Sequence, residues 1–198
     1  MTKPYSYSTI KYYDENCEKF VRETRHVKPE MLYEPFVKLV PRNGRILDLG
    51  CGSGRDANYF YNLGFHVVAI DASREMVART RDIFNGEVYQ MRFDQMKFQE
   101  EFDGIWACAS LLHVPHPALD WTIDICMSAL KPGGWLYMSF KVDRGDKPHD
   151  SRKFTNLTKA ELIKLVAKYK FDSWYTEDLR QNRKNENWLN ALVQKPQS

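Results

Sequence analysis

The chain has few of the features that mark secreted, membrane-spanning or metal-binding proteins. Its 198 residues contain only four cysteines, and no two of them form a C-x-x-C pair. Disulfide frameworks and thiolate metal sites need more or closer cysteines, so we expect reduced thiols, no metal site and a cytoplasmic protein. The apolar runs fall well short of the ~20 residues of a transmembrane helix. The first residues are polar and lack the apolar region of a signal peptide.

Glycine and proline are also scarce, with 10 and 9 residues, which excludes collagen-like and linker-like chains. The 29 Lys and Arg nearly balance the 26 Asp and Glu, and aromatic residues make up 14% of the chain. This composition is typical of a globular protein with one sizeable core. We expect residues 41–198 to form one structural unit and residues 1–40 to form an amino-terminal helical arm packed on it.

From residue 45 onward, strand and helix signals alternate along the chain. We expect strands at 45–49, 66–70, 87–93, 102–107, 135–140, 171–176 and 188–193. Helical patterns fall at 55–63, 73–84, 117–130 and 158–169, with Ser73 and Thr158 as amino-terminal caps. Strands joined by crossover helices pair in parallel, so the pattern predicts a doubly wound α/β sheet covered on both faces.

The amino-terminal arm contains two helical patterns. We expect one helix around residues 12–23 and a second that begins near Pro29. Apolar side chains recur in the second pattern at three- and four-residue spacing, which predicts one buried face. That face would consist of Met31, Leu32, Phe36, Leu39 and Val40.

The most specific motif is a glycine turn between the first predicted strand and the next helix. Gly50, Gly52 and Gly54 form G-x-G-x-G, and glycine permits positive φ angles and close approach of a ligand. The helix that follows presents free N–H groups at its amino end. Asp71 ends the second predicted strand, where an acid can accept hydrogen bonds from both ribose hydroxyls of an adenosine ligand.

Two residues beside this turn bear on the kind of nucleoside ligand. Arg55 stands where the dinucleotide fingerprint G-x-G-x-x-G requires its last glycine. Asp48 places a carboxylate in the strand before the turn, and its charge favours a cationic ligand over a pyrophosphate. A nicotinamide-dependent oxidoreductase is therefore the weaker interpretation.

Residues 48–56, Asp-Leu-Gly-Cys-Gly-Ser-Gly-Arg-Asp, resemble motif I of the class I S-adenosylmethionine-dependent methyltransferases. The resemblance spans about residues 45–140 and includes Leu-Lys-Pro-Gly-Gly at 130–134. More narrowly, residues 102–114 are similar to the small methyltransferases related to tellurite-resistance proteins. The resemblance implies S-adenosylmethionine as cofactor and a single-domain, Rossmann-like sheet of seven strands. Its strand order would be 3-2-1-4-5-7-6, with the last strand antiparallel.

The resemblance also implies which positions contact the cofactor. They are Asp48, Gly50, Cys51, Gly52, Gly54, Asp71, Ala72, Met76, Asp94, Gln95, Met96, Ala109, Ser110 and Leu111. In this arrangement Asp71 holds the ribose hydroxyls and Asp94 meets the adenine amino group.

His113, after the fourth predicted strand, is the candidate general base or acceptor-orienting group, because an imidazole can accept a proton near neutral pH. The alternative is a histidine that only hydrogen-bonds the backbone of its loop. On the amino-terminal arm, Tyr13 is a candidate catalytic group and Tyr12 is a candidate substrate contact. Both would lie over the cofactor pocket. Their alternative role is ordinary packing of an amphipathic helix.

The carboxy-terminal part is basic, with 13 Lys and Arg against 8 Asp and Glu from residue 141 onward. Lys141, Arg152 and Arg183 are candidates to bind an anionic acceptor. A solvated surface and a nucleic-acid backbone site are the alternatives. We expect a small-molecule acceptor, no membrane or nucleic-acid partner, and a monomer or homodimer. The other function hypotheses are a non-catalytic regulatory protein that binds S-adenosylmethionine and an RNA methyltransferase.

Overall fold

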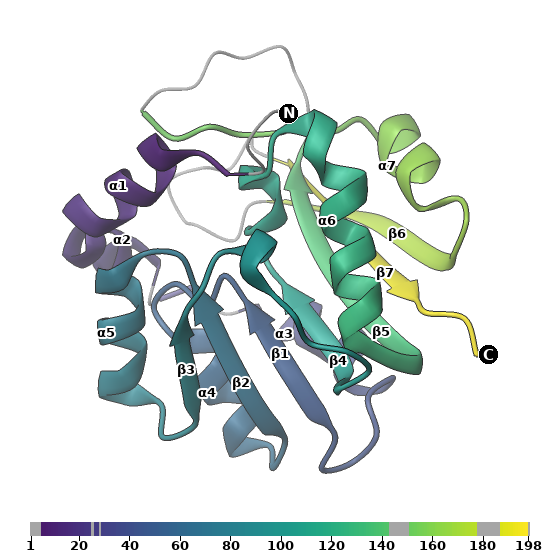
Figure 1. Ribbon diagram of the computed structural model, residues 1–198, viewed down its shortest axis with the longest axis horizontal. Helices are drawn as coiled ribbons and strands as arrows, with labels where there is room; N and C mark the ends of the chain where they lie inside the picture. Colours follow the sequence, from purple (N-terminus) through teal and green to yellow (C-terminus); the bar gives the residue numbers. More distant parts are fainter. Residues whose placement is uncertain (1–4, 25, 28, 143–150, 178–186, 198) are drawn as a thin grey trace.

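The computed structural model describes residues 5–24, 26–27, 29–142, 151–177 and 187–197. One seven-stranded sheet with the order β3-β2-β1-β4-β5-β7-β6 forms its centre (Figure 1). The strands are β1 (Arg45–Leu49), β2 (His66–Asp71), β3 (Glu87–Gln90), β4 (Phe102–Ala107), β5 (Leu130–Lys141), β6 (Lys170–Glu177) and β7 (Asn187–Gln194). The first five strands pair in parallel, whereas β7 is antiparallel to both β5 and β6. The predicted fold and strand order are confirmed.

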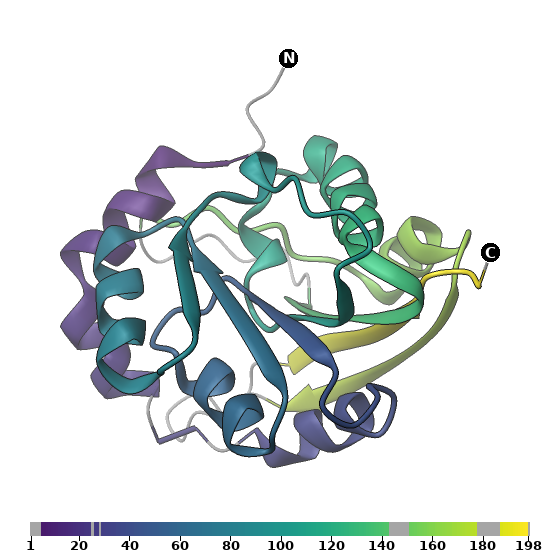
Figure 2. The same cartoon turned by 60° about the horizontal axis from the view of Figure 1, so that its bottom comes forward.

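The sheet has a hydrophobic core on each face because successive side chains of a strand point to opposite sides. Leu47 and Val68 belong to one core, whereas their neighbours Ile46 and Val67 belong to the other. Helices α6 (His116–Ala129) and α7 (Lys159–Val166) cover the first face. Helices α3 (Glu30–Val37), α4 (Arg55–Asn62) and α5 (Arg74–Ile83) cover the second. Figure 2 shows the sheet between these two layers.

The two predicted helix caps are confirmed. The Ser73 hydroxyl accepts a hydrogen bond from the Met76 N–H at the start of α5. At the start of α7, Thr158 and Glu161 form a reciprocal capping box. Each cap satisfies N–H groups that have no partner within the helix, so the sequence alone determines where these helices begin.

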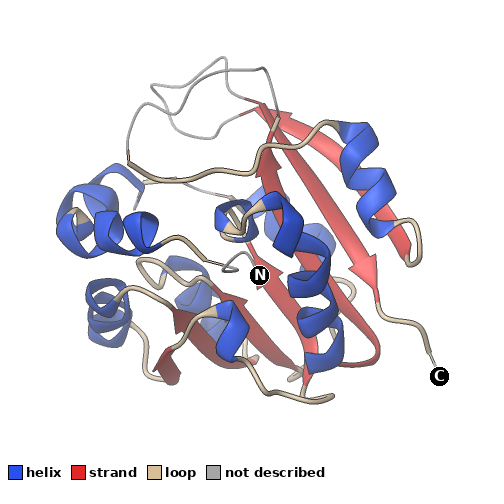
Figure 3. Ribbon diagram, turned by 45° about the horizontal axis from the view of Figure 1, so that its top comes forward, coloured by secondary structure: helices blue, strands red, loops and turns tan. Residues whose placement is uncertain are grey.

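The expected single helix around residues 12–23 is wrong, because the structure divides this segment into α1 (Tyr7–Glu15) and α2 (Cys17–Thr24). Asn16 causes the break: its side-chain amide donates to the Tyr12 carbonyl, and its backbone is not helical. Helix α1 lies beside the carboxyl ends of the parallel strands (Figure 3). Its Asp14 carboxylate accepts hydrogen bonds from the Ser73 hydroxyl at 2.6 Å and the Glu75 N–H at 3.3 Å. These contacts join α1 to the start of α5.

The predicted buried face of α3 is partly wrong. Met31 and Leu39 are 60% and 38% exposed. Tyr33, which the pattern did not include, is 2% exposed because its ring stacks on Tyr59 and its hydroxyl has a buried partner, Asp56. A polar group with a partner can be buried, which an apolar periodicity does not detect.

Two predicted strand boundaries also change. Strand β3 ends at Gln90, and residues Phe93–Gln95 form the short 3-10 helix η1. Strand β5 begins at Leu130, ahead of the predicted start at residue 135. Across the described ranges, no helix is long and apolar enough to cross a membrane.

Candidate active site

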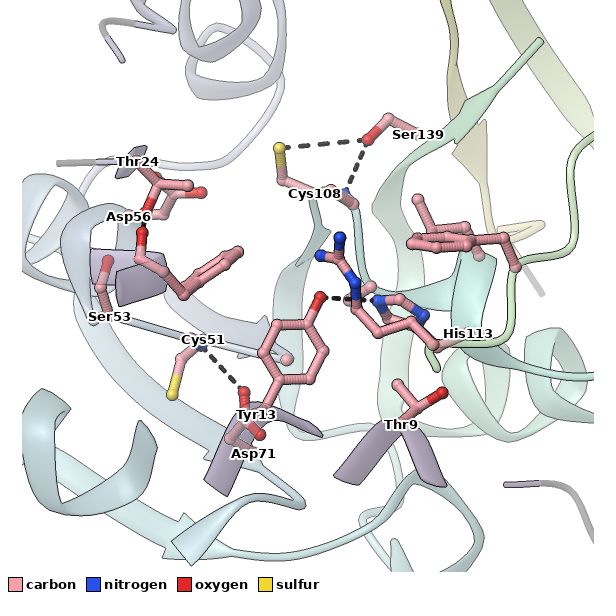
Figure 4. Close-up of a pocket in the computed structure, with 18 of the residues that line it drawn as sticks. Thr9, Tyr13, Thr24, Cys51, Ser53, Asp56, Asp71, Cys108, His113 and Ser139 are labelled. Carbon is pink, nitrogen blue, oxygen red and sulfur yellow. Dashed lines mark hydrogen bonds between the residues drawn. The ribbon is translucent and has the colours of Figure 1, made fainter. Parts of the chain in front are cut away.

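A cavity lies at the carboxyl ends of β1, β2 and β4, where the loops that follow these parallel strands meet. The glycine turn after β1, Asp71 at the end of β2 and the residues after β4 contribute its walls. Tyr13 of α1 closes it from the amino-terminal side, between Asp71 and His113 (Figure 4). The topology therefore brings together the motifs that are far apart in the sequence.

The glycine turn has the backbone conformation that only glycine adopts without strain. The φ angles of Gly50, Gly52 and Gly54 are +80°, +53° and +78°. A Cβ atom on Gly50 would lie 2.5 Å from the Cβ atom of Ser110, so a larger residue there would displace the loop after β4. A Cβ atom on Gly52 would meet only Phe20, at 3.6 Å. The turn thus packs tightly at Gly50 and is open to the cavity at Gly52.

Asp71 links the glycine turn to the start of α5. One carboxylate oxygen accepts the Gly52 N–H and the other accepts the Ser73 N–H, both at 2.9 Å. Burial raises the pKa of Asp71, although these N–H groups favour its charged form. Each carboxylate oxygen has a second lone pair, so Asp71 keeps acceptor capacity for hydroxyl groups in the cavity.

Asp48 lies beneath the turn, is 2% exposed and does not line the cavity. Burial, together with the charge of the neighbouring Asp56, raises the pKa of Asp48 well above its usual range. Its Oδ2 atom has no hydrogen-bond partner among the described residues. The carboxyl group therefore favours its neutral form, and the structure does not present its charge to a ligand as the sequence suggested.

We predict that Asp48→Asn stabilises the protein at neutral pH. A buried carboxyl with a raised pKa keeps its proton in the folded state and loses it in the unfolded state, so stability falls as the pH rises. Between the ordinary pKa and the raised pKa, the slope is about 1.4 kcal/mol per pH unit. Urea unfolding of both proteins at several pH values checks this. A stability difference that does not change between pH 5 and pH 8 would contradict the prediction.

The structure brings many of the predicted site residues to the cavity. Those that line it are Tyr13, Gly50, Cys51, Gly52, Asp71, Ala72, Ala109, Ser110, His113, Lys141 and Arg152. Those that do not are Tyr12, Asp48, Gly54, Met76, Asp94, Gln95, Met96 and Leu111. Arg183 lies outside the described residues. Within the described ranges, no group of three or more His, Cys, Asp and Glu could hold a metal ion.

Several of the residues away from the cavity have contacts that hold them elsewhere. Arg92 holds both carboxylate oxygens of Asp94, at 2.9 and 3.1 Å. Met96 and Leu111 are buried in the core on the α6 face. Gly54 packs against Thr80, where a Cβ atom would lie 2.9 Å from a methyl carbon. These contacts explain why some residues that belong to the motifs do not line the cavity.

His113 and Tyr13 form a hydrogen-bonded pair across 100 residues of sequence. The Tyr13 hydroxyl lies 2.9 Å from His113 Nε2, and His113 Nδ1 lies 2.8 Å from the Lys153 carbonyl oxygen. A carbonyl oxygen only accepts hydrogen bonds, so Nδ1 carries the proton. In the neutral ring, Nε2 is then the acceptor and Tyr13 the donor. Burial raises the pKa of Tyr13, with the Arg152 charge opposing, which keeps its hydroxyl protonated.

Arg152 and Lys141 lie on aromatic rings in the wall next to His113. The Arg152 guanidinium carbon is 4.5 Å from the ring centroid of Tyr12 and 5.1 Å from that of Phe154. The Lys141 Nζ atom is 4.9 Å from the Phe154 ring centroid. This part of the cavity is therefore both cationic and aromatic.

Sequence reasoning missed a buried polar network at the other side of the cavity. Asp56, the second residue of α4, accepts hydrogen bonds from Tyr33 Oη at 2.6 Å, Trp106 Nε1 at 2.9 Å and Arg55 Nε at 2.6 Å. Although burial opposes ionisation, Arg55 and these donors lower the pKa of Asp56. The pairing of Arg and Asp at the start of α4 was the available signal, but its partners come from α3 and β4.

The two cysteines of the cavity are unsuited to act as nucleophiles. Burial raises the pKa of Cys108 to about 12 and that of Cys51 well above its usual range. Only the thiolate attacks, so both thiols stay protonated at neutral pH.

Comparison with known proteins identifies what this arrangement resembles. The model of a methyltransferase domain family matches residues 46–134. A ubiquinone biosynthesis O-methyltransferase of Xylella fastidiosa is 38% identical over 110 residues, which are 52% of this chain and 44% of that protein. A ubiquinone biosynthesis O-methyltransferase of Xanthomonas axonopodis is 33% identical over 57% of this chain and 49% of its own length. The chain thus spans less than half the length of these curated relatives.

The fold is shared over nearly the whole chain. The 1,6-didemethyltoxoflavin-N1-methyltransferase of Burkholderia thailandensis, whose structure contains S-adenosylhomocysteine, aligns with a TM-score of 0.76. It is 20% identical and covers 99% of this chain and 92% of its own. This structural likeness shows the fold. The domain match over residues 46–134 and these curated relatives are the sequence evidence, and they support, as the sequence predicted, a class I S-adenosylmethionine-dependent methyltransferase.

Proposed function

We propose that this chain transfers a methyl group from S-adenosylmethionine to a hydroxyl oxygen of a small molecule. One observation carries the proposal: a single cavity contains the glycine turn and Asp71 on one side and the Tyr13–His113 pair on the other. The curated relatives are named O-methyltransferases, which supports oxygen as the acceptor atom.

The cavity residues fit the cofactor. The turn is open at Gly52, so a ligand can approach the backbone closely. Asp71 has acceptor capacity for the two ribose hydroxyls. Ser110, after β4, packs against Gly50 of the turn, and its buried hydroxyl has no hydrogen-bond partner among the described residues. We assign the ribose to Asp71 and the open side of the turn at Gly52 to the part of the cofactor that follows it.

The bound cofactor supplies an electrophilic methyl group on a sulfonium. The protein has to align the acceptor oxygen, which can supply roughly 7–11 kcal/mol, and remove the hydroxyl proton. The acceptor hydroxyl donates to Tyr13 Oη, and Tyr13 passes its own proton to His113 Nε2. The Lys153 carbonyl then stabilises the imidazolium through Nδ1. This relay uses the hydrogen bonds already present in the protein.

The cationic wall indicates an acceptor with an acidic group near its hydroxyl. Arg152 and Lys141 line the cavity beside His113, and a guanidinium or ammonium binds a carboxylate or phenolate by charge-assisted hydrogen bonds. Phe154 lies under both cations and provides a surface for an aromatic ring. A hydroxylated aromatic acid combines these features.

The test is turnover with a panel of acceptors that contains phenols, hydroxylated aromatic acids, thiols and a short RNA. We expect S-adenosylhomocysteine and a methyl ether from the hydroxylated aromatic acids, detected by mass spectrometry. Methyl transfer to thiols or RNA alone would contradict the proposal. Tight binding of S-adenosylmethionine without turnover on any acceptor would favour a non-catalytic binding protein instead.

A further inference from the structure

The loop after β4 contains a backbone conformation that an alanine rarely adopts. Ala109 lines the cavity and has a φ angle of +53°, in the left-handed region that favours glycine. Among the described residues, Asn43 and Glu100 are the other non-glycine residues with a positive φ angle, and neither lines the cavity. A strained residue persists only where its surroundings hold it, so the backbone of Ala109 needs a partner that fixes it.

Ser139 of β5 is that partner. Its hydroxyl oxygen accepts the Ala109 N–H at 2.8 Å, and its proton is donated to the Cys108 sulfur at 4.0 Å (Figure 4). The backbone pairing of β4 with β5 ends at Ala107 and Met138, so the Ser139 side chain takes the place of the next backbone acceptor. Ser139 is 2% exposed, and the packing around it leaves its hydroxyl little freedom to move.

The backbone at Ala109 sets the course of the chain that leads to His113. Ser110 follows directly, and its carbonyl oxygen accepts the His113 N–H at 3.0 Å, which closes the short 3-10 helix η2 (Leu111–His113). At the end of this helix the imidazole Nε2 lies 2.9 Å from Tyr13 Oη. Hydrogen bonds weaken steeply when their distance or angle changes, so a rotation about the Ala109 backbone would break this pair.

We infer that Ser139 is a positioning residue for the proposed base: it holds Ala109 in the left-handed conformation, and this conformation directs His113 toward Tyr13. The inference rests on the proposed function, because that function makes His113 the final proton acceptor. Ser139 acts through the backbone of the loop and not by contact with the reacting atoms.

The first measurement reads the His113 ring without any turnover. In nitrogen-15 spectra of the histidine-labelled full chain, wild-type His113 should show a protonated Nδ1 and an Nε2 acceptor, with the signals assigned from the His113→Gln spectrum. Ser139→Ala removes the hydroxyl and should move both ring signals toward those of the exposed His66. Thr122→Val removes a similarly buried hydroxyl within α6. It is the matched control and should leave the His113 ring signals unchanged.

The second measurement separates kcat from KM and from cofactor affinity. A displacement of about 1 Å at a catalytic group can cost about 100-fold. We therefore expect Ser139→Ala to lower kcat about 10- to 100-fold, with little change in KM or in the affinity for S-adenosylhomocysteine. Because glycine adopts positive φ angles without a restraint, adding Ala109→Gly to Ser139→Ala should recover most of the lost kcat. Ser139→Cys keeps the volume but accepts hydrogen bonds weakly, and it tests the same bond if Ser139→Ala does not fold.

The two measurements together decide the role of Ser139. If kcat falls while the ring signals stay unchanged, Ser139 contacts the substrate directly and the inference is overturned. Full activity of Ser139→Ala, or a double variant no more active than Ser139→Ala, overturns it as well. A wild-type protein that methylates no hydroxyl acceptor overturns the proposed function, and the ring signals then still decide whether Ser139 positions His113.

Discussion

Replacing His113 with glutamine should lower kcat for methyl transfer to a hydroxyl acceptor about 100- to 10,000-fold, the usual contribution of a positioned acid–base group. Glutamine keeps a polar side chain near Tyr13 but cannot take a proton. Because the glycine turn and Asp71 are untouched, the affinity for S-adenosylhomocysteine should change little. Steady-state kinetics and calorimetry on the same preparation measure both quantities.

Two further variants separate the possible roles of this pair. Tyr13→Phe removes only the hydroxyl that bonds His113 Nε2, so the proposed relay predicts a loss of kcat of the same order. If Tyr13→Phe retains full turnover while His113→Gln does not, His113 acts on the acceptor directly and the relay is wrong. His66→Gln, an exposed histidine at the start of β2, is the control. Full activity of His113→Gln would remove the base from the mechanism.

Replacing Asp71 with asparagine should weaken binding of S-adenosylhomocysteine about 100- to 10,000-fold. The carboxylate can offer the ribose two charge-assisted hydrogen bonds, each worth about 1.5–3 kcal/mol, and every 1.4 kcal/mol is about tenfold in affinity. The amide can also accept only one of the two N–H groups, from Gly52 and Ser73, that Asp71 now holds. Calorimetric titration measures the loss.

Circular dichroism shows whether the Asp71→Asn protein keeps its fold, and Asp82→Asn, an exposed carboxylate on α5, provides the comparison. A folded Asp71→Asn protein with wild-type affinity would place the ribose elsewhere. A different residue would then have to bind the ribose if the glycine turn still contacts the cofactor.

Much of the architecture was predictable because it follows from short-range patterns. The apolar strands 45–49 and 66–70 alternate between two cores, and the caps at Ser73 and Thr158 begin their helices where expected. The glycine turn was also predictable, since its positive φ angles need glycine whatever surrounds them. Strand order came from the family resemblance, because local pattern does not contain long-range pairing.

The active site was predictable only in part. A motif states which residues lie near one loop, but the direction of each side chain depends on what packs against it. Asp94 follows β3 as expected, but its carboxylate accepts hydrogen bonds from Arg92, two residues earlier. Asp48 lies in the motif, yet the strand buries it beneath the turn.

By itself, the sequence determined the sheet, the glycine turn and the family, because these depend on spacing and backbone conformation. Only the tertiary structure decided that Tyr13 meets His113, that the Lys153 carbonyl lies at Nδ1 of that ring, and that Asp56 accepts a hydrogen bond from Arg55. Each of these contacts joins segments that no periodicity relates. Hydrogen bonds of this kind need atoms within about 3 Å in a defined direction, and only the folded chain brings them there.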